Sequence, residues 1–497
     1  MEQTNSDDGK PPHCRGRHYY FPDATDAQWN DWRWQFRHRI TTLEELSHFI
    51  TVPTDEWDLR REILRDFRMG ITPYYLSLID PHDPDDPILR QVVPLRDEYT
   101  FRAVGDEDPL GEENFSPVPG ITHRYPDRVL MVVCNSCAVY CRYCTRKRLM
   151  YADAVPDLEI DRMVDYIART PTVRDVVVSG GDPFNYATPK LERILAKLRA
   201  IPHLEIIRIG SRVPVSLPQR VDAELCAMLQ RYHPIWVNVH FNHPRECTPE
   251  AARACDLLLR AGIPLNNQSV LLRGVNDDVD TMKALVHGLM RLRVRPYYLY
   301  HCDPVRGTQH MRTTIAKGIE IMEGLRGYTS GLAIPTYVID APGGGGKIPV
   351  GPQYLVNYDP EAGRALLRNY QGRLFEYHEI ESADSPLPVP EPEPVLALAL
   401  EHAAVSGGGG KSDNGNGNGN GKNGNGARNG RARGNGNGKS AAAPGGPVVG
   451  KSRWAHNKRT QPRPGRRSAA AGGAIQALLP FAEVATAGPT PSVTERG

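Results

Sequence analysis

The chain has 497 residues, 40% of them hydrophobic, and a formal net charge of +2 at pH 7. This length fits two or three average domains or one large α/β barrel with extensions, and the apolar fraction suffices for a sizeable core. The near-neutral charge argues against a protein that binds nucleic acid over its whole surface.

The N-terminus and the cysteines bear on the cellular compartment. Met1–Pro12 is polar and acidic and contains no apolar signal segment. No run in the chain approaches the roughly 18 apolar residues of a membrane span. We therefore expect a cytoplasmic protein without membrane contact. In that compartment the nine cysteines are not expected to form a disulfide framework, so a tight cluster of them indicates metal or redox chemistry.

The first part of the chain is predicted to be helical. Aromatic and aliphatic residues recur among charges at helical spacing between residues 26 and 50, which predicts an amphipathic helical region. A connector rich in Pro and Asp follows at Pro81–Pro94. We expect a mostly helical extension over residues 1–120.

From Arg128 onward, short β-branched runs alternate with amphipathic helical patterns such as Leu191–Ala200 and Pro249–Ala261. The predicted strands are Val129–Cys134, Asp175–Ser179, Glu205–Gly210, Ile235–His240, Pro264–Leu271 and Val294–Tyr300. Six βα units of this kind predict parallel strands with helical crossovers, and favour a full or partial barrel over a doubly wound open sheet with the same rhythm. In parallel barrels the functional groups lie at the carboxyl ends of the strands.

A cysteine cluster directly follows the first of these strands. Cys137, Cys141 and Cys144 have the spacing C-x-x-x-C-x-x-C. Three thiolates on one loop hold three irons of a 4Fe–4S cube and leave the fourth iron open to chelation by S-adenosylmethionine, as in the radical S-adenosylmethionine signature that this loop resembles. The alternative is a zinc site in which Cys134 joins the three, but structural zinc sites usually separate their two cysteine pairs by a longer loop.

The next predicted strand ends in Ser179-Gly180-Gly181-Asp182. Two glycines at this position let the backbone approach a ligand closely, although a tight βα turn explains them equally well. The segment lies one βα unit after the cysteine loop. In the superfamily that the cysteine loop resembles, the matching segment contacts the methionine part of S-adenosylmethionine, and the resemblance implies the same contact here.

A glycine loop with a lysine follows the strand-like run Ile334–Ile339. It spans Asp340–Lys347, and four consecutive glycines precede the lysine. Such a loop aims backbone N–H groups at an anion, and Lys347 would either bind a phosphate by charge or form a Schiff base with an aldehyde cofactor. The loop is not a nucleotide-binding P-loop, because Ala341 and Ile348 stand where that motif requires Gly and Ser or Thr.

Residues 383–497 differ in composition from the rest of the chain. Pro386–Pro394 is rich in Pro and Glu, and Asp413–Lys439 is a Gly/Asn repeat with basic residues. Between Val405 and Gly472 there are thirteen Lys and Arg and one acid. We expect a disordered tail, because this composition cannot bury enough apolar surface to offset its ordering entropy. Non-specific binding of nucleic acid by the tail is a competing function, but a solvated linker is favoured.

Three segments together closely resemble the lysine 2,3-aminomutase family. They are Thr122–Arg128, Cys137–Arg148 and Asp340–Lys347. The likeness extends from about Trp29 to about Tyr377 and includes His240–Pro244, Asn267–Ser269 and Arg295–Tyr298. It implies a partial (β/α)6 barrel of the radical S-adenosylmethionine type, with the cluster and pyridoxal phosphate at one mouth. We expect this barrel over residues 121–350 and a segment packed on it over residues 351–382. The tail has no counterpart in the family.

The resemblance also implies an enzyme, an isomerase that moves the amino group of L-lysine from C2 to C3. Its cofactors would be a 4Fe–4S cluster, S-adenosylmethionine and pyridoxal phosphate. The same shift on arginine, or less favourably on glutamate, is the alternative.

Residue roles follow from the same match. Lys347 would form the Schiff base with pyridoxal phosphate, and Arg146 would pair with the α-carboxylate of the substrate. Asp303 and Asp340 would hold the side-chain ammonium of lysine. The residues implied at the other cofactor groups are Arg124, Tyr125 and Arg128 at the phosphate, and Ser179, Gly180, Gly181, Asp182, His240 and Gln268 at S-adenosylmethionine.

Some members of the family bind a zinc between subunits through one cysteine in the barrel and others near the C-terminus. Here Asp278 stands at the barrel position and no cysteine follows Cys302, so we expect no structural zinc. The expected partners are an amino-acid substrate, an electron donor such as flavodoxin or ferredoxin, and further copies of the chain in a homo-oligomer.

Single residues also have simpler interpretations. Arg146 and Lys147 would otherwise be a solvated basic turn, and His240 a core histidine. Asp303 would otherwise cap a helix that begins near Thr313, and Asp340 would be a turn residue before Pro342. Tyr300 could line the pocket, but aromatic residues in strands more often pack in a core, so we interpret it as a packing residue and leave it out of the site.

Overall fold

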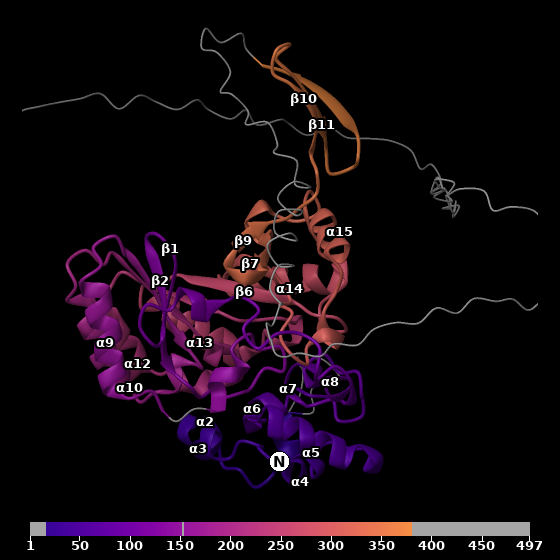
Figure 1. Cartoon of the computed structure of the whole chain (residues 1–497). Coiled ribbons are helices and arrows are strands. Elements are labelled where there is room, and N and C mark those ends of the chain that lie inside the picture. The colour runs from indigo at the N-terminus through magenta and orange to yellow at the C-terminus, as the bar shows by residue number, and fades with distance from the viewer. Residues whose placement is uncertain (1–15, 152–153, 380–497) are drawn as a thin grey trace, which may run out of the picture. The chain divides into compact units, whose positions relative to one another are not determined.

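The computed structural model describes residues 16–151 and 154–379 (Figure 1). Its N-terminal part consists of short helices: α1 (Gly16–Tyr20), α2 (Asp26–Asn30), α3 (Trp32–Arg37), α4 (Leu43–Ser47), α5 (Trp57–Asp66), α6 (Pro73–Leu76), α7 (Leu89–Val92) and α8 (Arg96–Thr100). The predicted helical region at 26–50 is therefore confirmed, but it is broken at Asp31. The Asp31 side chain accepts the first backbone N–H groups of α3 while its own N–H ends α2, so one residue caps both helices.

The six predicted strands are confirmed and belong to one larger sheet. Its strands are β1 (Ile121–Tyr125), β2 (Arg128–Cys134), β3 (Asp175–Gly180), β4 (Ile206–Gly210), β5 (Ile235–Val239), β6 (Leu265–Leu271), β7 (Arg295–His301), β8 (Thr336–Ala341) and β9 (Gly346–Pro349). Neighbouring strands follow in chain order, and every pair from β2 to β8 is parallel. A doubly wound sheet reverses its strand order, so this topology is that of a barrel.

Helices follow the parallel strands and cover the outside of the sheet (Figure 1). They are α9 (Asp157–Ala168), α10 (Thr188–Arg199), α11 (Val213–Ser216), α12 (Ala223–Gln230), α13 (Pro249–Arg260), α14 (Val279–Arg291) and α15 (Ile315–Leu325). Helix α13 is representative, because Ala251, Ala254, Cys255 and Leu258 are buried at helical spacing while Thr248 caps its first turn.

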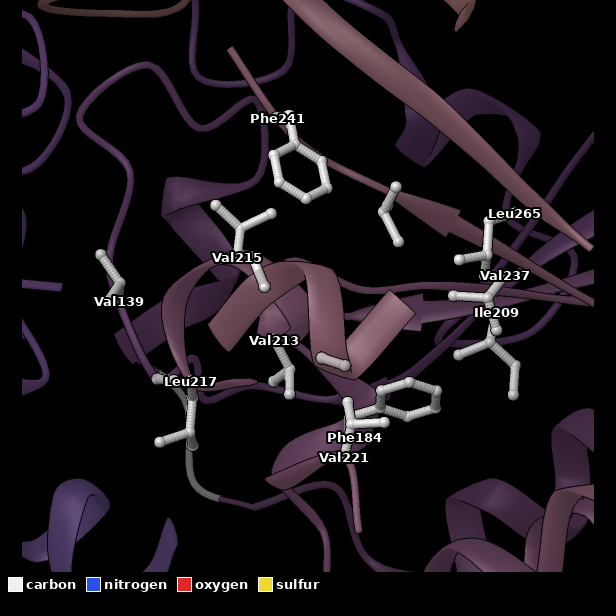
Figure 2. Packing of buried hydrophobic residues seen from close by; sticks show 14 of the residues in the cluster. Val139, Phe184, Ile209, Val213, Val215, Leu217, Val221, Val237, Phe241 and Leu265 are labelled. Carbon is white, nitrogen blue, oxygen red and sulfur yellow. The ribbon is translucent and has the colours of Figure 1, made fainter. Parts of the chain in front are cut away.

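The core lies between this helical layer and the outer face of the sheet. Ile209, Val237 and Leu265 are register partners on β4, β5 and β6, and Figure 2 shows them side by side with Phe184 and Val213 nearby. Burial of each such side chain contributes about 1.5–3 kcal/mol. Alternate residues of the same strands, including Arg208, point to the inside of the barrel.

The edges of the sheet approach each other without a backbone ladder between β1 and β9 in the described residues. Strand β1 runs antiparallel to β2, and β9 runs antiparallel to β8. The backbone N–H of Lys347 on β9 donates to the phenolic oxygen of Tyr125 on β1 at 2.9 Å. The barrel is thus partial, and a side chain bridges its seam.

After the barrel, β10 (Leu355–Asp359), β11 (Arg364–Arg368) and β12 (Leu374–His378) form a separate antiparallel sheet. Arg368 pairs with Glu323 of α15 at 2.9 Å, and the ring of Tyr370 contacts that of Tyr328. The tail expected over residues 383–497 lies outside the described residues. Among the residues that are described, no helix combines the length and apolarity needed to cross a membrane.

Candidate active site

One cavity of about 820 Å³ occupies the inside of the barrel. Its lining includes every residue that the sequence analysis proposed for a site: Cys137, Cys141, Cys144, Arg124, Tyr125, Arg128, Ser179, Gly180, Gly181, Asp182, His240, Gln268, Arg146, Asp303, Asp340 and Lys347. Segments more than 200 residues apart in sequence therefore meet in one place. Their individual roles are proposals that the geometry below supports.

The cysteine loop is held in place by the N-terminal helical part. Arg39 donates through Nη1 to the carbonyl oxygen of Cys137 at 2.6 Å, and the N–H of Tyr140 donates to the carbonyl of Gly70 at 3.0 Å. The buried Arg142 guanidinium makes a bidentate pair with Glu98, at 2.6 and 2.9 Å. The extension therefore fixes the backbone that presents the three thiols.

The thiols themselves lie in a low-dielectric environment. Burial raises the pKa of Cys144 to about 11 and raises that of Cys137 well above its usual value. Arg212 donates through Nη1 to the Sγ of Cys141 at 2.7 Å. Without a metal, Cys137 and Cys144 are therefore neutral thiols, and iron binding must displace their protons.

Cys134 differs from the other three cysteines. It is only 1% exposed, it does not line the cavity, and its Sγ accepts from the N–H of Ser136 at 3.4 Å. Within residues 16–151 and 154–379, no three His, Cys, Asp or Glu side chains are grouped as they would be around a single metal ion. Cys134 therefore differs from the three cysteines of the cluster interpretation in that it does not line the cavity.

The two glycines of the Ser179–Asp182 segment have a structural role in addition to the ligand contact proposed from the sequence. A Cβ at Gly180, where φ is 131°, would lie 2.2 Å from the carbonyl oxygen of Cys134. A Cβ at Gly181 would lie 2.3 Å from that of Ser136. The glycines thus let the end of β3 pack against the cysteine loop, while both still line the cavity.

Asp182 joins the turns that follow β3 and β4. Its carboxylate accepts hydrogen bonds from the Ser211 hydroxyl at 2.8 Å and from the Arg212 N–H at 2.7 Å. Burial nevertheless raises the pKa of Asp182 to about 6. The carboxylate therefore fixes the backbone at Arg212, the residue that contacts Cys141.

His240 and Gln268 lie deeper along the cavity wall. The Nε2 of His240 shares a 2.8 Å hydrogen bond with the Tyr143 hydroxyl, and the two rings stack at 5.7 Å. Burial lowers the pKa of His240 to about 3, so the ring is neutral. Gln268 donates to the Tyr300 hydroxyl at 3.2 Å.

Lys347 projects into the cavity from β9, directly after the glycine loop. Three glycines of the loop have φ values of 68°, 96° and 80° (Gly343, Gly344 and Gly346), which side chains rarely adopt. Lys347 and Asp340 are register partners on β9 and β8, and the Nζ lies 3.0 and 3.1 Å from the two carboxylate oxygens. It also lies 5.3 Å from the centroid of the Tyr300 ring.

Arg124, Tyr125 and Arg128 form a cationic group beside this lysine. The Arg124 guanidinium donates to the carbonyl of Leu110, but its Nε is buried without a hydrogen-bond partner. The Arg128 guanidinium stacks over the Tyr125 ring at 4.0 Å. A buried unpaired N–H that lines a cavity requires an acceptor, and a phosphate oxygen fits that requirement.

The remaining charged groups separate into a cationic and an anionic side. Arg146 is held by Glu112 through bonds of 2.6 and 3.2 Å, and although burial opposes it, Arg146 and Arg148 keep the pKa of Glu112 low. Asp303 accepts from the Thr145 hydroxyl at 2.8 Å. Burial, with the nearby charge of Asp340, raises the pKa of Asp303 to about 6.

These contacts exclude most of the simpler interpretations. Arg146 is half-buried and paired with Glu112, and Lys147 is buried and paired with Glu98, so they are not a solvated turn. Thr314, not Asp303, caps α15. Asp340 is 6% exposed within a strand and is not a turn residue.

Our interpretation of Tyr300 as a packing residue is wrong, because Tyr300 lines the cavity beside Lys347. Sequence reasoning also missed Glu112 and Arg212. Glu112 is 34 residues from Arg146, and Arg212 is 71 residues from Cys141. Neither belongs to a motif, so no local signal could have found them.

A parallel barrel with this cysteine loop at the end of its first parallel strand defines a radical S-adenosylmethionine enzyme. The sequence profile of the radical SAM superfamily matches residues 131–285, and that of lysine-2,3-aminomutase matches residues 322–398. Membership of the superfamily implies a 4Fe–4S cluster and S-adenosylmethionine.

Similar curated proteins identify the family. The L-lysine 2,3-aminomutase of Clostridium subterminale is 54% identical over 365 residues, which are 73% of this chain and 87% of that protein. The Bacillus subtilis L-lysine 2,3-aminomutase is 48% identical over 362 residues, 72% and 76% of the two chains. The glutamate 2,3-aminomutase of Clostridioides difficile is 44% identical over 364 residues, 73% and 86% of the two chains. The chain belongs to the lysine 2,3-aminomutase family and is an isomerase.

Asp278 stands at the position where the resemblance implies a zinc-binding cysteine in some members of the family. The Asp278 side chain accepts from the N–H of Thr281 at 2.8 Å and caps α14. This residue thus has a structural role in the helix that covers β6 and β7.

Proposed function

We propose that the chain is an L-lysine 2,3-aminomutase that converts L-α-lysine to β-lysine with a 4Fe–4S cluster, S-adenosylmethionine and pyridoxal phosphate. The observation that carries the proposal is the placement of charge in one cavity. Arg146 lies on the cationic side, Asp303 and Asp340 lie on the anionic side, and Lys347 is within 3.1 Å of Asp340.

The residues present fit pyridoxal phosphate. Lys347 supplies an amine inside a cavity, and the unpaired Nε of Arg124 supplies a donor for a phosphate oxygen. Arg128 and the Tyr125 hydroxyl would complete the phosphate site. When bound, pyridoxal phosphate supplies a π system that makes a 1,2-shift of nitrogen accessible.

The cysteine loop fits the second cofactor pair. Cys137, Cys141 and Cys144 would hold three irons of a cube, with Ser179–Asp182, His240 and Gln268 around S-adenosylmethionine. When bound, the cluster and S-adenosylmethionine together supply a carbon-centred radical that removes hydrogen from the β-carbon of the substrate. The neutral His240 ring and the Tyr143 hydroxyl add no charge of their own beside the Arg212 guanidinium.

The chain itself selects and orients the substrate. The Arg146 guanidinium is fixed by Glu112 through Nε and Nη2, which leaves Nη1 for the α-carboxylate. The charge of Asp340 contributes to the raised pKa of Asp303, and a cation between the two carboxylates relieves that repulsion. An ammonium at the end of the substrate side chain provides this cation.

Arginine also provides a cation, and its planar guanidinium could pair with both carboxylates, so it is the main alternative substrate. Glutamate would place a third carboxylate beside Asp303 and Asp340, which costs several kcal/mol. The relatives named for lysine reach 54% identity and the one named for glutamate 44%, which supports lysine further.

The chemistry also requires a one-electron donor, such as flavodoxin or ferredoxin, to reduce the cluster. We place the enzyme in the cytoplasm, where such donors and the free thiols of the cysteine loop are both maintained. A homo-oligomer is part of the proposal as well.

The test is anaerobic conversion of L-lysine by the purified, reduced holoenzyme, with product identified by chromatography against authentic β-lysine. Borohydride treatment should attach the cofactor covalently to Lys347, and Lys347→Ala should prevent both attachment and turnover. Attachment at another lysine in the variant would show that the role of Lys347 is wrongly assigned.

A further inference from the structure

The barrel cavity does not end at the site described above. In closed parallel barrels, layers of side chains usually fill the interior. Here the cavity continues along the inner faces of the strands to their first residues, Arg128 on β2, Asp175 on β3 and Arg295 on β7, and to Trp236, the second residue of β5. We call these four residues the N-terminal mouth.

The N-terminal mouth reaches solvent. Trp236 is 37% exposed although it is a large aromatic residue that lines a cavity, and Arg295 is exposed. Strand β7 runs from Arg295 to His301, which corresponds to roughly 20 Å between this mouth and the opposite one. The cavity thus extends to solvent-exposed residues at this end of the barrel.

Arginine side chains line the N-terminal mouth. Arg128 and Arg295 both line the cavity there, and Arg208 lies one layer further in. The guanidinium of Arg208 is paired with Asp175 at 2.9 Å, so that charge is neutralised inside the barrel. Arg128 is likewise paired with Asp127 at 2.8 Å. Arg295 is therefore the arginine that gives this opening a positive potential, which attracts anions from solution.

The opposite opening is less favourable for a phosphate. The cysteine loop lies there, and so do Asp303 and Asp340. Arg146 lies there too but is paired with Glu112, and Asp340 is paired with Lys347. Asp303 has no ion pair among the described residues, so a phosphate dianion that entered there would have to pass this carboxylate before it reached Arg128 at the first position of β2. Arg128 begins its strand, whereas Lys347 is paired with Asp340 near the carboxyl end of β8.

We propose that the N-terminal mouth is the route by which pyridoxal phosphate enters the barrel, and that Arg295 steers its phosphate. The aldehyde end leads toward Lys347 and the phosphate end stays beside Arg128. This inference rests on the proposed function, because it requires pyridoxal phosphate as the cofactor. On this proposal, pyridoxal phosphate enters through one opening of the barrel, and S-adenosylmethionine and the amino acid enter through the other.

The test measures how fast pyridoxal phosphate combines with cofactor-free enzyme, by stopped-flow absorbance of the Schiff base and by borohydride trapping at Lys347. Arg295→Glu should lower the second-order rate constant about tenfold at low ionic strength, and Arg295→Gln about threefold, with both effects shrinking at high salt. The matched control is Arg306→Glu, which makes the same charge change at an exposed residue after the carboxyl end of β7, outside the cavity.

Pyridoxal, which has the aldehyde but no phosphate, is the matched ligand, and its rate should be the same in all four proteins. An unchanged pyridoxal phosphate rate in Arg295→Glu, or an equal loss in Arg306→Glu, would overturn the entry route while trapping at Lys347 still supported the proposed function. Failure of the wild-type enzyme to trap pyridoxal phosphate at Lys347 would reject the proposed function and the entry route together.

Discussion

The backbone N–H of Lys347 donates a 2.9 Å hydrogen bond to the phenolic oxygen of Tyr125, and this bond bridges the two edge strands of the barrel. Gly346, at φ 80°, precedes Lys347, and a Cβ there would lie 2.8 Å from the same phenolic oxygen. The position of the lysine is therefore fixed by a residue 222 positions earlier in the chain.

Replacement of Tyr125 by Phe should weaken pyridoxal phosphate binding while the barrel stays folded. The loss of one hydrogen bond costs about 1 kcal/mol, which corresponds to an increase in Kd of about fivefold. Absorbance titration of the cofactor-free enzyme measures this. Tyr358→Phe, in the separate β10–β12 sheet, is the control, and an equal effect in both variants would contradict the assigned role.

Each of Cys137, Cys141 and Cys144, when replaced by Ala, should lose the iron–sulfur absorbance and the formation of 5′-deoxyadenosine. Cys134→Ala should retain both, because Cys134 does not line the cavity. Iron analysis after anaerobic reconstitution measures the outcome. A Cys134 variant without iron beside a Cys137 variant that keeps it would show that the three ligands were wrongly chosen.

Gly181→Ala should reduce the iron content of the reconstituted enzyme, because its Cβ would lie 2.3 Å from the backbone of the cysteine loop. Gly210→Ala is a matched control at the end of the neighbouring strand, where the Cβ would meet only the Ser179 hydroxyl at 3.6 Å. Full iron content in Gly181→Ala would mean that the close approach of the two backbones is not needed.

The raised pKa of Asp303, about 6, predicts a pH dependence for lysine. The carboxylate form binds the substrate ammonium, so this attraction is present above that pH and is lost as protonation proceeds below it. We expect kcat/KM for lysine to fall by up to about tenfold per pH unit below about 6.

Asp182 also has a pKa raised to about 6, so the assignment requires a variant. In Asp303→Asn, kcat/KM for lysine should no longer fall below about pH 6. Its value at neutral pH should be lower than in the wild type. An unchanged pH profile in this variant would assign the ionisation to another group.

The sequence predicted the repeated elements well because their signals are local. Ile209 and Val237 belong to β-branched runs, which indicate strands. Apolar residues between Ala251 and Leu258 recur at helical spacing, which indicates a helix. These elements could therefore be placed before the elements that pack against them were known. The glycine loop and the cysteine loop were also visible, since their chemistry depends on adjacent residues.

The parts that could not be predicted depend on contacts between distant segments. Nothing near Glu112 indicates that it holds Arg146, and nothing near Arg212 indicates that it reaches Cys141. The packing of Gly181 on Ser136 was likewise hidden, because a glycine pair has the same sequence whether it faces a ligand or another backbone. Tyr300 was misjudged because strand aromatics usually pack in a core.

The central claim, that the cavity selects an amino acid with a cationic side chain and lysine above all, is tested most directly by comparing kcat/KM for lysine, arginine and glutamate under anaerobic conditions. We predict the highest value for lysine, with β-lysine as product, and a large loss for lysine in Asp303→Asn and Asp340→Asn. A higher value for arginine would contradict the substrate while leaving the chemistry intact. A higher value for glutamate would contradict the roles of both aspartates.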